Sequence, residues 1–332
     1  MGSAERYVVK PGDRVETIAA RFRTTRQEIA RINTGKILDH LGPGDILFVP
    51  VGGASVAPHG SAGKPFLRSI RAEPNTAGSE ILTPAETHQD EFELRLQLVL
   101  YMKRMDPGPI PFVDIAGRQG VAIAPWPPGM FETFKTAAKT KAELFWSHRF
   151  QFWPPGSYPF FNWPPGPHGE ARGVDCTLSI AFALDPRFAT HVIRCFRRAA
   201  GETTAELDTA NWTDAISEDR KLQGDDAYTD NNGIQVPTTN NTVAHEVGHL
   251  LGLDHPHCTG QERECYGDGH EAWKIMNIMG AGNNVLMMNA KPWLDRLVQH
   301  TGVSREDWTP YLSDSPYAPG PKVSLSYRGG RM

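Results

Sequence analysis

The most regular pattern of apolar and polar positions lies at residues 92–102, where every second residue is apolar. Six residues carry the alternation: Phe92, Leu94, Leu96, Leu98, Leu100 and Met102. This is the period of a strand with one face in a core. Shorter runs rich in β-branched or aromatic residues predict further strands at 111–115, 121–124, 177–184, 191–196 and 234–236.

Two other segments have apolar residues at intervals of three and four, which predicts amphipathic helices. The helix expected over 130–150 has its apolar face at Phe131, Phe134, Ala138, Ala142, Phe145 and Trp146. The helix expected over 289–301 buries Trp293, Leu294, Leu297 and Val298 and stops at Gly302. Strands and helices in this mixture predict an α+β chain, and 332 residues are enough for more than one domain.

Residues 6–50 form a separate unit with the order strand, helix, helix, strand. A strand and turn at 7–13 precede helical spacing at Val15, Ile18, Ala19 and Phe22. Thr25 is a candidate N-cap for a second helix, and residues 41–50 read as a turn and a closing strand.

This unit resembles a LysM domain, on three features: Pro-Gly-Asp at 11–13, Asn33 after the second helix, and Pro-Gly-Asp-Ile-Leu-Phe-Val-Pro at 43–50. The resemblance implies binding of N-acetylglucosamine glycans such as peptidoglycan, in a groove lined by Gly12, Asp13, Arg14, Val15, Ile37 and Leu38. The family usually has Thr-Leu where this chain has Arg14-Val15. The alternative is a LysM used as an adaptor in a contractile, phage-tail-like machine.

Residues 245–255 contain three histidines and a glutamate at the spacing HExxHxxGxxH, a pattern that can bind a metal ion. Residues four apart share one face of a helix, so His245 and His249 can bind one ion. Gly252 allows the chain to turn, and His255 can return as a third ligand. Three protein ligands leave one position open, as in catalytic zinc sites. Glu246, beside the first ligand, is then the candidate proton acceptor.

With Asn277-Ile278-Met279-Gly280 downstream, the motif resembles the metzincin metallopeptidases. The resemblance implies a zincin-type domain, which has a mixed twisted sheet, an active-site helix and a Met-turn with Met279 beneath Zn²⁺. Met276 is the fallback for this methionine. Pro256 is similar to the serralysin branch, but Ala281 stands where that branch has a tyrosine, so a matrixin-like relationship stays open. The activity implied is that of a zinc metalloendopeptidase.

These motifs predict five parts of the chain. They are a LysM domain (6–50), a flexible linker (51–65), a β-rich region (66–124), a metzincin-like peptidase domain (125–312) and a tail (313–332). The β-rich region is either a small domain or an extension of the catalytic sheet. Trp-Pro-Pro-Gly occurs at 126–129, 153–156 and 163–166, which we interpret as loop packing in preference to a ligand-binding rim.

All four cysteines lie in the second half of the chain. Cys258 and Cys265 bracket a short polar loop, which favours a disulfide. Cys176 and Cys195, on neighbouring predicted strands, are candidates for a second. Paired cysteines indicate an oxidising compartment, and four thiols in a cytosolic protein are the alternative.

The net charge and the hydropathy of the chain exclude two classes of partner. A net charge of −4 without a basic run argues against nucleic acid, and no apolar stretch suits a membrane span. No leader is visible, so we expect a secreted or periplasmic protein that uses a route without a signal peptide. An effector toxin carried by a contractile injection machine would explain both the missing leader and the LysM unit. Its partner would then be a protein of the secretion machine or an immunity protein. Calcium has weak support, since Asp225, Asp226 and Asp268 lack EF-hand spacing.

The sequence thus predicts a zinc-dependent metalloendopeptidase that a LysM module directs to peptidoglycan or the cell envelope. Its substrate is a protein or peptide. One alternative is a peptidase that cuts peptidoglycan stem peptides. The other is a LysM adaptor with an inert zinc domain, although such a domain would not need to keep Glu246.

Overall fold

The computed structural model describes residues 4–10, 13–22, 26, 29, 33, 41, 45–50, 66–89, 91–108, 112–115, 118–155, 158–162, 173–201, 209–216, 218–258 and 262–313. The predicted linker at 51–65 and, apart from Ser313, the predicted tail lie outside these residues. Mixed α/β structure in several sheets agrees with the fold class expected from the sequence.

The amino-terminal unit pairs β1 (Ala4–Val8) antiparallel with β2 (Ile46–Pro50), next to α1 (Val15–Arg21). Its small core consists of Val9, Val15, Ile18, Ala19, Ile29, Leu47 and Val49. The buried Asn33 side chain accepts a hydrogen bond from Phe48 N at 2.9 Å and donates to the carbonyls of Ile29 and Phe48 at 2.7 Å. Asn33 therefore ties the helical segment to the closing strand.

Among the described residues, ten strands form the large sheet of the main body. They are β3 (Ser69–Ile70), β4 (Gly78–Leu82), β5 (Phe92–Arg104), β6 (Phe112–Ile115), β7 (Arg118–Ala124), β8 (Phe150–Trp153), β9 (Val174–Phe182), β10 (His191–Arg198), β11 (Asn211–Thr213) and β16 (Thr309–Leu312). The main path runs β16-β8-β9-β5-β10-β7-β6, with β4 and β3 also joined through β5 and β11 joined to β10.

The strand predicted from the period-two pattern, β5, lies in the middle of this sheet. It pairs parallel with both β9 and β10 and antiparallel with β4. Its alternating apolar residues are almost fully buried. Of the two alternatives for the β-rich region, the structure therefore has residues 66–124 in the same sheet as β8, β9 and β10.

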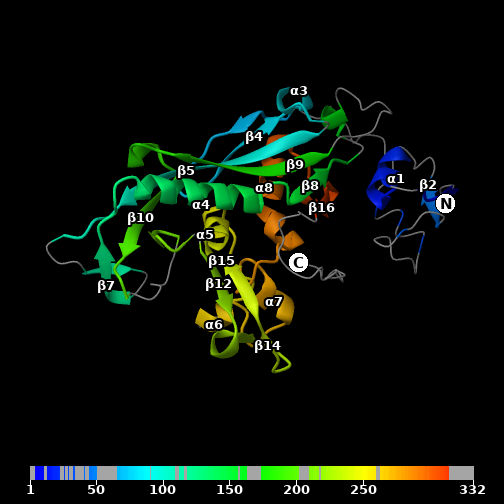
Figure 1. Cartoon of the computed structure of the whole chain (residues 1–332). Helices are drawn as coiled ribbons and strands as arrows, with labels where there is room; N and C mark the ends of the chain where they lie inside the picture. Colours follow the sequence, from blue (N-terminus) through cyan, green and yellow to red (C-terminus); the bar gives the residue numbers. More distant parts are fainter. Residues whose placement is uncertain are drawn as a thin grey trace.

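The predicted long helix is α4 (Met130–Trp146), and its apolar face is buried as expected. It packs on β9 and on α5 (Thr242–Leu250), so it lies between the sheet and the motif helix (Figure 1). Trp146 Nε1 donates to Ala244 O of α5 at 2.9 Å. From α8 (Lys291–Thr301), Trp293 Nε1 donates to Thr177 O of β9 at 3.0 Å and its ring contacts that of Trp146. Two buried tryptophans thus fix α5 to the sheet.

The remaining short elements surround α5 and line the edges of the main body. The strands are β12 (Asp219–Leu222), β13 (Tyr228–Thr229), β14 (Gln235–Val236) and β15 (Thr238–Asn241). The helices are α3 (Pro84–Thr87), α6 (Glu262–Cys265) and α7 (Ala272–Met276), with 3-10 turns at η2 (Pro159–Asn162), η3 (Pro186–Phe188), η4 (Gly224–Asp226), η5 (Met287–Ala290) and η6 (Arg305–Asp307). None of the helices in the described ranges is long and apolar enough to cross a bilayer.

The first Trp-Pro-Pro-Gly segment packs into the loop before α4, as we interpreted it from the sequence. Trp126 is buried, and its ring centroid lies 5.1 Å from those of both Phe131 and Phe134 on α4. It anchors the loop that leads into that helix.

The disulfide predicted between Cys176 and Cys195 is wrong. Both residues are free and buried, on β9 and β10, and β5 runs between those strands. Cys176 faces Leu94 of β5 and Cys195 faces Arg104. Ten residues of strand separate these two positions, or about 33 Å at ~3.3 Å per residue. A disulfide requires Cα atoms within about 7 Å.

Burial raises the pKa of both the Cys176 and the Cys195 thiol. In denaturant without reductant, we expect two reactive thiols per chain, because Cys258 and Cys265 are bonded to each other. Thiol titration before and after reduction measures this, and reduction should reveal the two others. The double variant Cys176→Ser/Cys195→Ser should show none before reduction. Four thiols in the unreduced wild type would contradict the pairing.

Candidate metal centre

The motif helix α5 begins at a side-chain cap. Asn241 precedes the helix and its side chain accepts a hydrogen bond from Ala244 N at 3.2 Å. Val243, Val247, Leu250 and Leu251 form an apolar stripe and are buried. With that stripe packed into the core, the opposite side of α5 carries the histidines.

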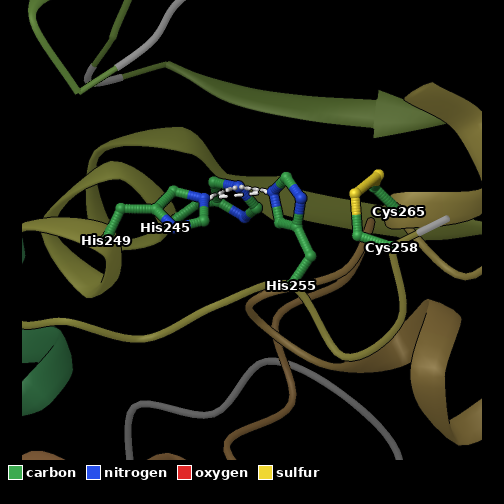
Figure 2. Close-up of a disulfide and its surroundings, with 5 residues drawn as sticks. All are labelled: His245, His249, His255, Cys258 and Cys265. Atoms are coloured by element: carbon green, nitrogen blue, oxygen red, sulfur yellow. Dashed lines mark hydrogen bonds between the residues drawn. A yellow bond between two sulfur atoms is a disulfide. The ribbon is translucent and has the colours of Figure 1, made fainter. Parts of the chain in front are cut away.

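Three imidazoles converge at the carboxyl end of α5 (Figure 2). His245 and His249 come from the helix and His255 from the loop after it. Their Nε2 atoms are 3.2 Å apart for His245 and His249, 3.0 Å for His249 and His255, and 3.3 Å for His255 and His245. The structure therefore brings all three predicted ligands to one point.

Backbone carbonyls set the orientation of two of the rings. Nδ1 of His245 lies 2.7 Å from Ile278 O, and Nδ1 of His249 lies 2.8 Å from Leu253 O. A carbonyl oxygen only accepts, so each Nδ1 carries the proton and each Nε2 presents a lone pair. A hydrogen bond from the other ring nitrogen, as here, fixes a metal-binding histidine in the tautomer that a metal needs.

The protein also keeps these rings neutral. Burial, followed by the nearby His249, lowers the pKa of His245 to about 3. Burial, again followed by His249, lowers the pKa of His255 to about 4. The pKa of His249 is lowered by burial as well. Neutral imidazole is the form that ligates a metal, so at neutral pH no proton has to leave before binding.

The turn that returns His255 to the helix depends on Gly252, which has φ +88°. This left-handed conformation favours glycine. Leu253 N then donates to Gly248 O at 3.0 Å and closes the turn. The predicted helix stop and the return of the third histidine are both present.

Met279 lies in a compact loop directly against α5. Its side chain is 1% exposed and contacts the position of Gly248, where an added Cβ would overlap the sulfur. Asn277, fully buried, accepts from Met279 N at 2.7 Å, and Ile278 O is the acceptor for His245. The loop predicted as a Met-turn thus both supports α5 and orients one of its histidines.

Glu246 is 4% exposed and follows the first histidine on α5. Its position on the helix is the one expected for a proton acceptor at the metal centre.

The spacing of the three nitrogens fits a zinc ion. Nitrogens bound tetrahedrally at 2.0–2.1 Å lie about 3.3 Å apart, close to the 3.0–3.3 Å observed. The Nε2 lone pairs of His245 and His249 also point toward the same place, an arrangement that suits a cation. Geometry and donor type therefore both suit one Zn²⁺.

A residue that the sequence analysis missed, Tyr266, forms a wall of the site. Its ring is stacked on His245 with centroids 5.5 Å apart and lies 4.7 Å from the ring of His255. It also packs against the small cluster of Leu222, Ile275 and Ala281. Tyr266 comes directly after Cys265, whose disulfide with Cys258 holds α6 beside His255. The only sequence signal that could have pointed to Tyr266 was the expected pairing of Cys258 with Cys265, close after His255.

Of the predicted glycan-binding residues, Gly12, Ile37 and Leu38 lie outside the described residues. Val15 is buried in the core of its unit, so its side chain does not face a ligand. Asp13 accepts from Tyr7 Oη at 2.5 Å and from Lys10 N at 2.8 Å. Arg14 donates to Tyr311 Oη of β16 at 2.9 Å, which joins the unit to the main body.

One part of the chain matches a known family. Residues 7–50 match the LysM domain. No curated protein and no solved structure matches the chain. The LysM resemblance of the amino-terminal unit is confirmed, while the metzincin resemblance rests on the motif and on the geometry above.

The close contact at Gly248 gives a test of how the metal centre is supported. In Gly248→Ala the new methyl group would overlap Met279 Sδ and lie 3.2 Å from the Trp146 ring, so we expect a loss of about 1–3 kcal/mol in stability. Zinc affinity should fall too, because α5 must shift from the loop that orients His245. Thermal unfolding and zinc titration measure the two effects.

The double variant Gly248→Ala/Met279→Ala provides the control. Removing the methionine side chain relieves the overlap, so its loss of stability should be smaller than the sum of the two single losses. Strict additivity would show that Gly248 and Met279 do not interact.

Proposed function

We propose that this protein is a zinc-dependent metalloendopeptidase that its LysM domain directs to peptidoglycan or the cell envelope. The observation that supports it most is the convergence of the Nε2 atoms of three neutral imidazoles beside a buried glutamate. Three protein ligands with an open fourth position are typical of hydrolytic zinc sites.

When bound, Zn²⁺ supplies Lewis acidity, which makes water acidic near neutral pH and polarises a peptide carbonyl. His245, His249 and His255 would hold the ion through their converging Nε2 atoms. The Glu246 carboxylate takes a proton from the attacking water and later gives it to the leaving amine. The water oxygen bonds to the carbonyl carbon, the C–N bond breaks, and the products are an acid and an amine.

Tyr266 is the residue we propose to shape the substrate side of the site. Its ring flanks His245 and His255, and it packs against the cluster that contains Ala281, the position where the serralysin branch has a tyrosine. An aromatic side chain from the residue after α6 thus lies beside the three histidines, although the Met-turn segment carries none.

The LysM domain supplies the targeting in this proposal. Its family binds N-acetylglucosamine glycans, so it would keep the peptidase near the cell wall and raise the local concentration of substrate. The Cys258–Cys265 disulfide agrees with work in an oxidising compartment outside the cytosol.

Replacing Glu246 with alanine separates metal binding from catalysis. Glu246→Ala should retain zinc, since the three ligands are unchanged, and lose about 10²–10⁴-fold in cleavage rate. Zinc content and digestion of casein and of purified sacculi, with and without chelator, are the measurements. Glu132→Ala, an exposed carboxylate on α4, should behave as wild type.

Equal cleavage by wild type and Glu246→Ala would refute the assignment of the base. Casein cleavage that chelator abolishes supports a protein substrate. Release of peptides from sacculi without casein cleavage would favour the alternative, a peptidase for peptidoglycan stem peptides. No cleavage of either substrate by zinc-loaded protein would favour an inert zinc domain.

Retention on purified peptidoglycan tests the targeting role. We expect the full chain to be retained, and Arg14→Ala to weaken retention about tenfold through loss of a charged donor, or ~1.4 kcal/mol. Arg187→Ala removes the same charge from a turn in the main body and should bind as wild type. A wild-type chain that is not retained would instead favour the adaptor role.

A further inference from the structure

His255 belongs to two groups of candidate ligands. One is the set of three histidines, and the other consists of His255, Cys258 and Cys265, whose ligand atoms all lie within 4.8 Å of one another. Figure 2 shows the disulfide directly beside the His255 ring, on the side away from α5. The second group is therefore preassembled by the disulfide itself.

The disulfide determines which group can bind a metal. A sulfur in a disulfide has no thiolate charge and is a poor ligand, so the oxidised protein offers the three histidines. Reduction releases two thiolates, which bind Zn²⁺ and similar ions tightly, at bond lengths near 2.3 Å. The two sulfurs, which start at bonding distance, would have to separate to about 3.8 Å to bind the same ion tetrahedrally.

We propose that reduction of Cys258–Cys265 creates a second metal site from His255, Cys258 and Cys265, which withdraws the ion and its third ligand from the catalytic histidines. A neutral imidazole carries one ring proton and therefore offers a single nitrogen lone pair, so the His255 ring binds one ion at a time. The two sites are therefore mutually exclusive. This inference rests on the metal site of the proposed function.

The disulfide is accessible to a reductant, and its reduction balances in electrons and protons. Cys258 is exposed and Cys265 is buried, so the Cys258 sulfur is the accessible point of attack for a dithiol reductant. The reductant is oxidised to its own disulfide by two electrons, and the S–S bond becomes two thiols. Binding of the metal releases their two protons to solvent.

The consequence is a peptidase that is latent under reducing conditions. In the reduced state, His245 and His249 would lack both the ion and His255, and Glu246 would have no metal-activated water beside it. Oxidation would restore the open three-histidine site. A peptidase made in a reducing compartment and used in an oxidising one would thereby spare proteins where it is made.

Cobalt spectroscopy tests the proposal independently of activity. The full chain is loaded with Co²⁺ and its absorption is recorded oxidised, and again after reduction with a phosphine and its anaerobic removal. We expect visible bands without sulfur-to-metal charge transfer in the oxidised protein. The reduced protein should gain a near-ultraviolet thiolate band at an unchanged ratio of one Co²⁺ per chain, because His255 is shared.

Matched cysteine variants identify the ligands. Cys258→Ser/Cys265→Ser should bind Co²⁺ but show no thiolate band after reduction. Cys176→Ser/Cys195→Ser removes the same number of thiols from buried strands and should keep the band. Absence of the band in reduced wild type, or its persistence in Cys258→Ser/Cys265→Ser, would overturn the proposal.

His245→Ala distinguishes a separate site from a thiolate that merely joins the three histidines. This variant should lose Co²⁺ binding when oxidised and regain it, with the thiolate band, when reduced. Loss of binding in both states would overturn the second site. Failure of oxidised wild type to bind Co²⁺ would instead refute the proposed function, even if the reduced protein bound it.

Discussion

The metal centre depends on three imidazole nitrogens that must face one another with their lone pairs exposed. The three Nε2 atoms lie 3.0–3.3 Å apart, and the lone pairs of His245 and His249 at 3.2 Å repel each other. The fold enforces this arrangement by burial, which keeps the rings neutral, and by carbonyl acceptors at Ile278 and Leu253, which hold the protons on Nδ1. Folding therefore prepares the ligands in advance, and the binding of an ion relieves the repulsion.

Close backbone approach makes this arrangement possible. Gly248 lets α5 contact Met279, and a Cβ at Gly280 or Gly282 would overlap the carbonyl oxygens of Lys274 or Met276. The loop that orients His245 can thus lie directly beneath the helix. The two tryptophans of α4 and α8 connect the same helix to the sheet, so strain at the metal centre would pass into the main core.

Local sequence patterns predicted individual helices and strands better than the order of the strands in the sheet or the contacts between elements. Residue spacing was enough for β5, α4 and the motif helix, because burial on one face imposes a period that short segments reveal. Sheet order and register are non-local, so Cys176 and Cys195 looked like neighbours when β5 in fact separates them. Tyr266 was missed for the same reason, since only the Cys258–Cys265 disulfide brings α6 to the histidines.

That disulfide also links the chemistry of the site to its surroundings. The disulfide joins Cys258, three residues after His255, to Cys265 at the end of α6, and both sulfurs lie within 4.8 Å of a ring nitrogen of His255. In that position the bond fixes Tyr266 against the metal centre and, at the same time, keeps two thiolates from competing for it. A cross-link placed a few residues further along would not bring two sulfurs beside His255, so the position of this one connects the loop to the candidate metal centre.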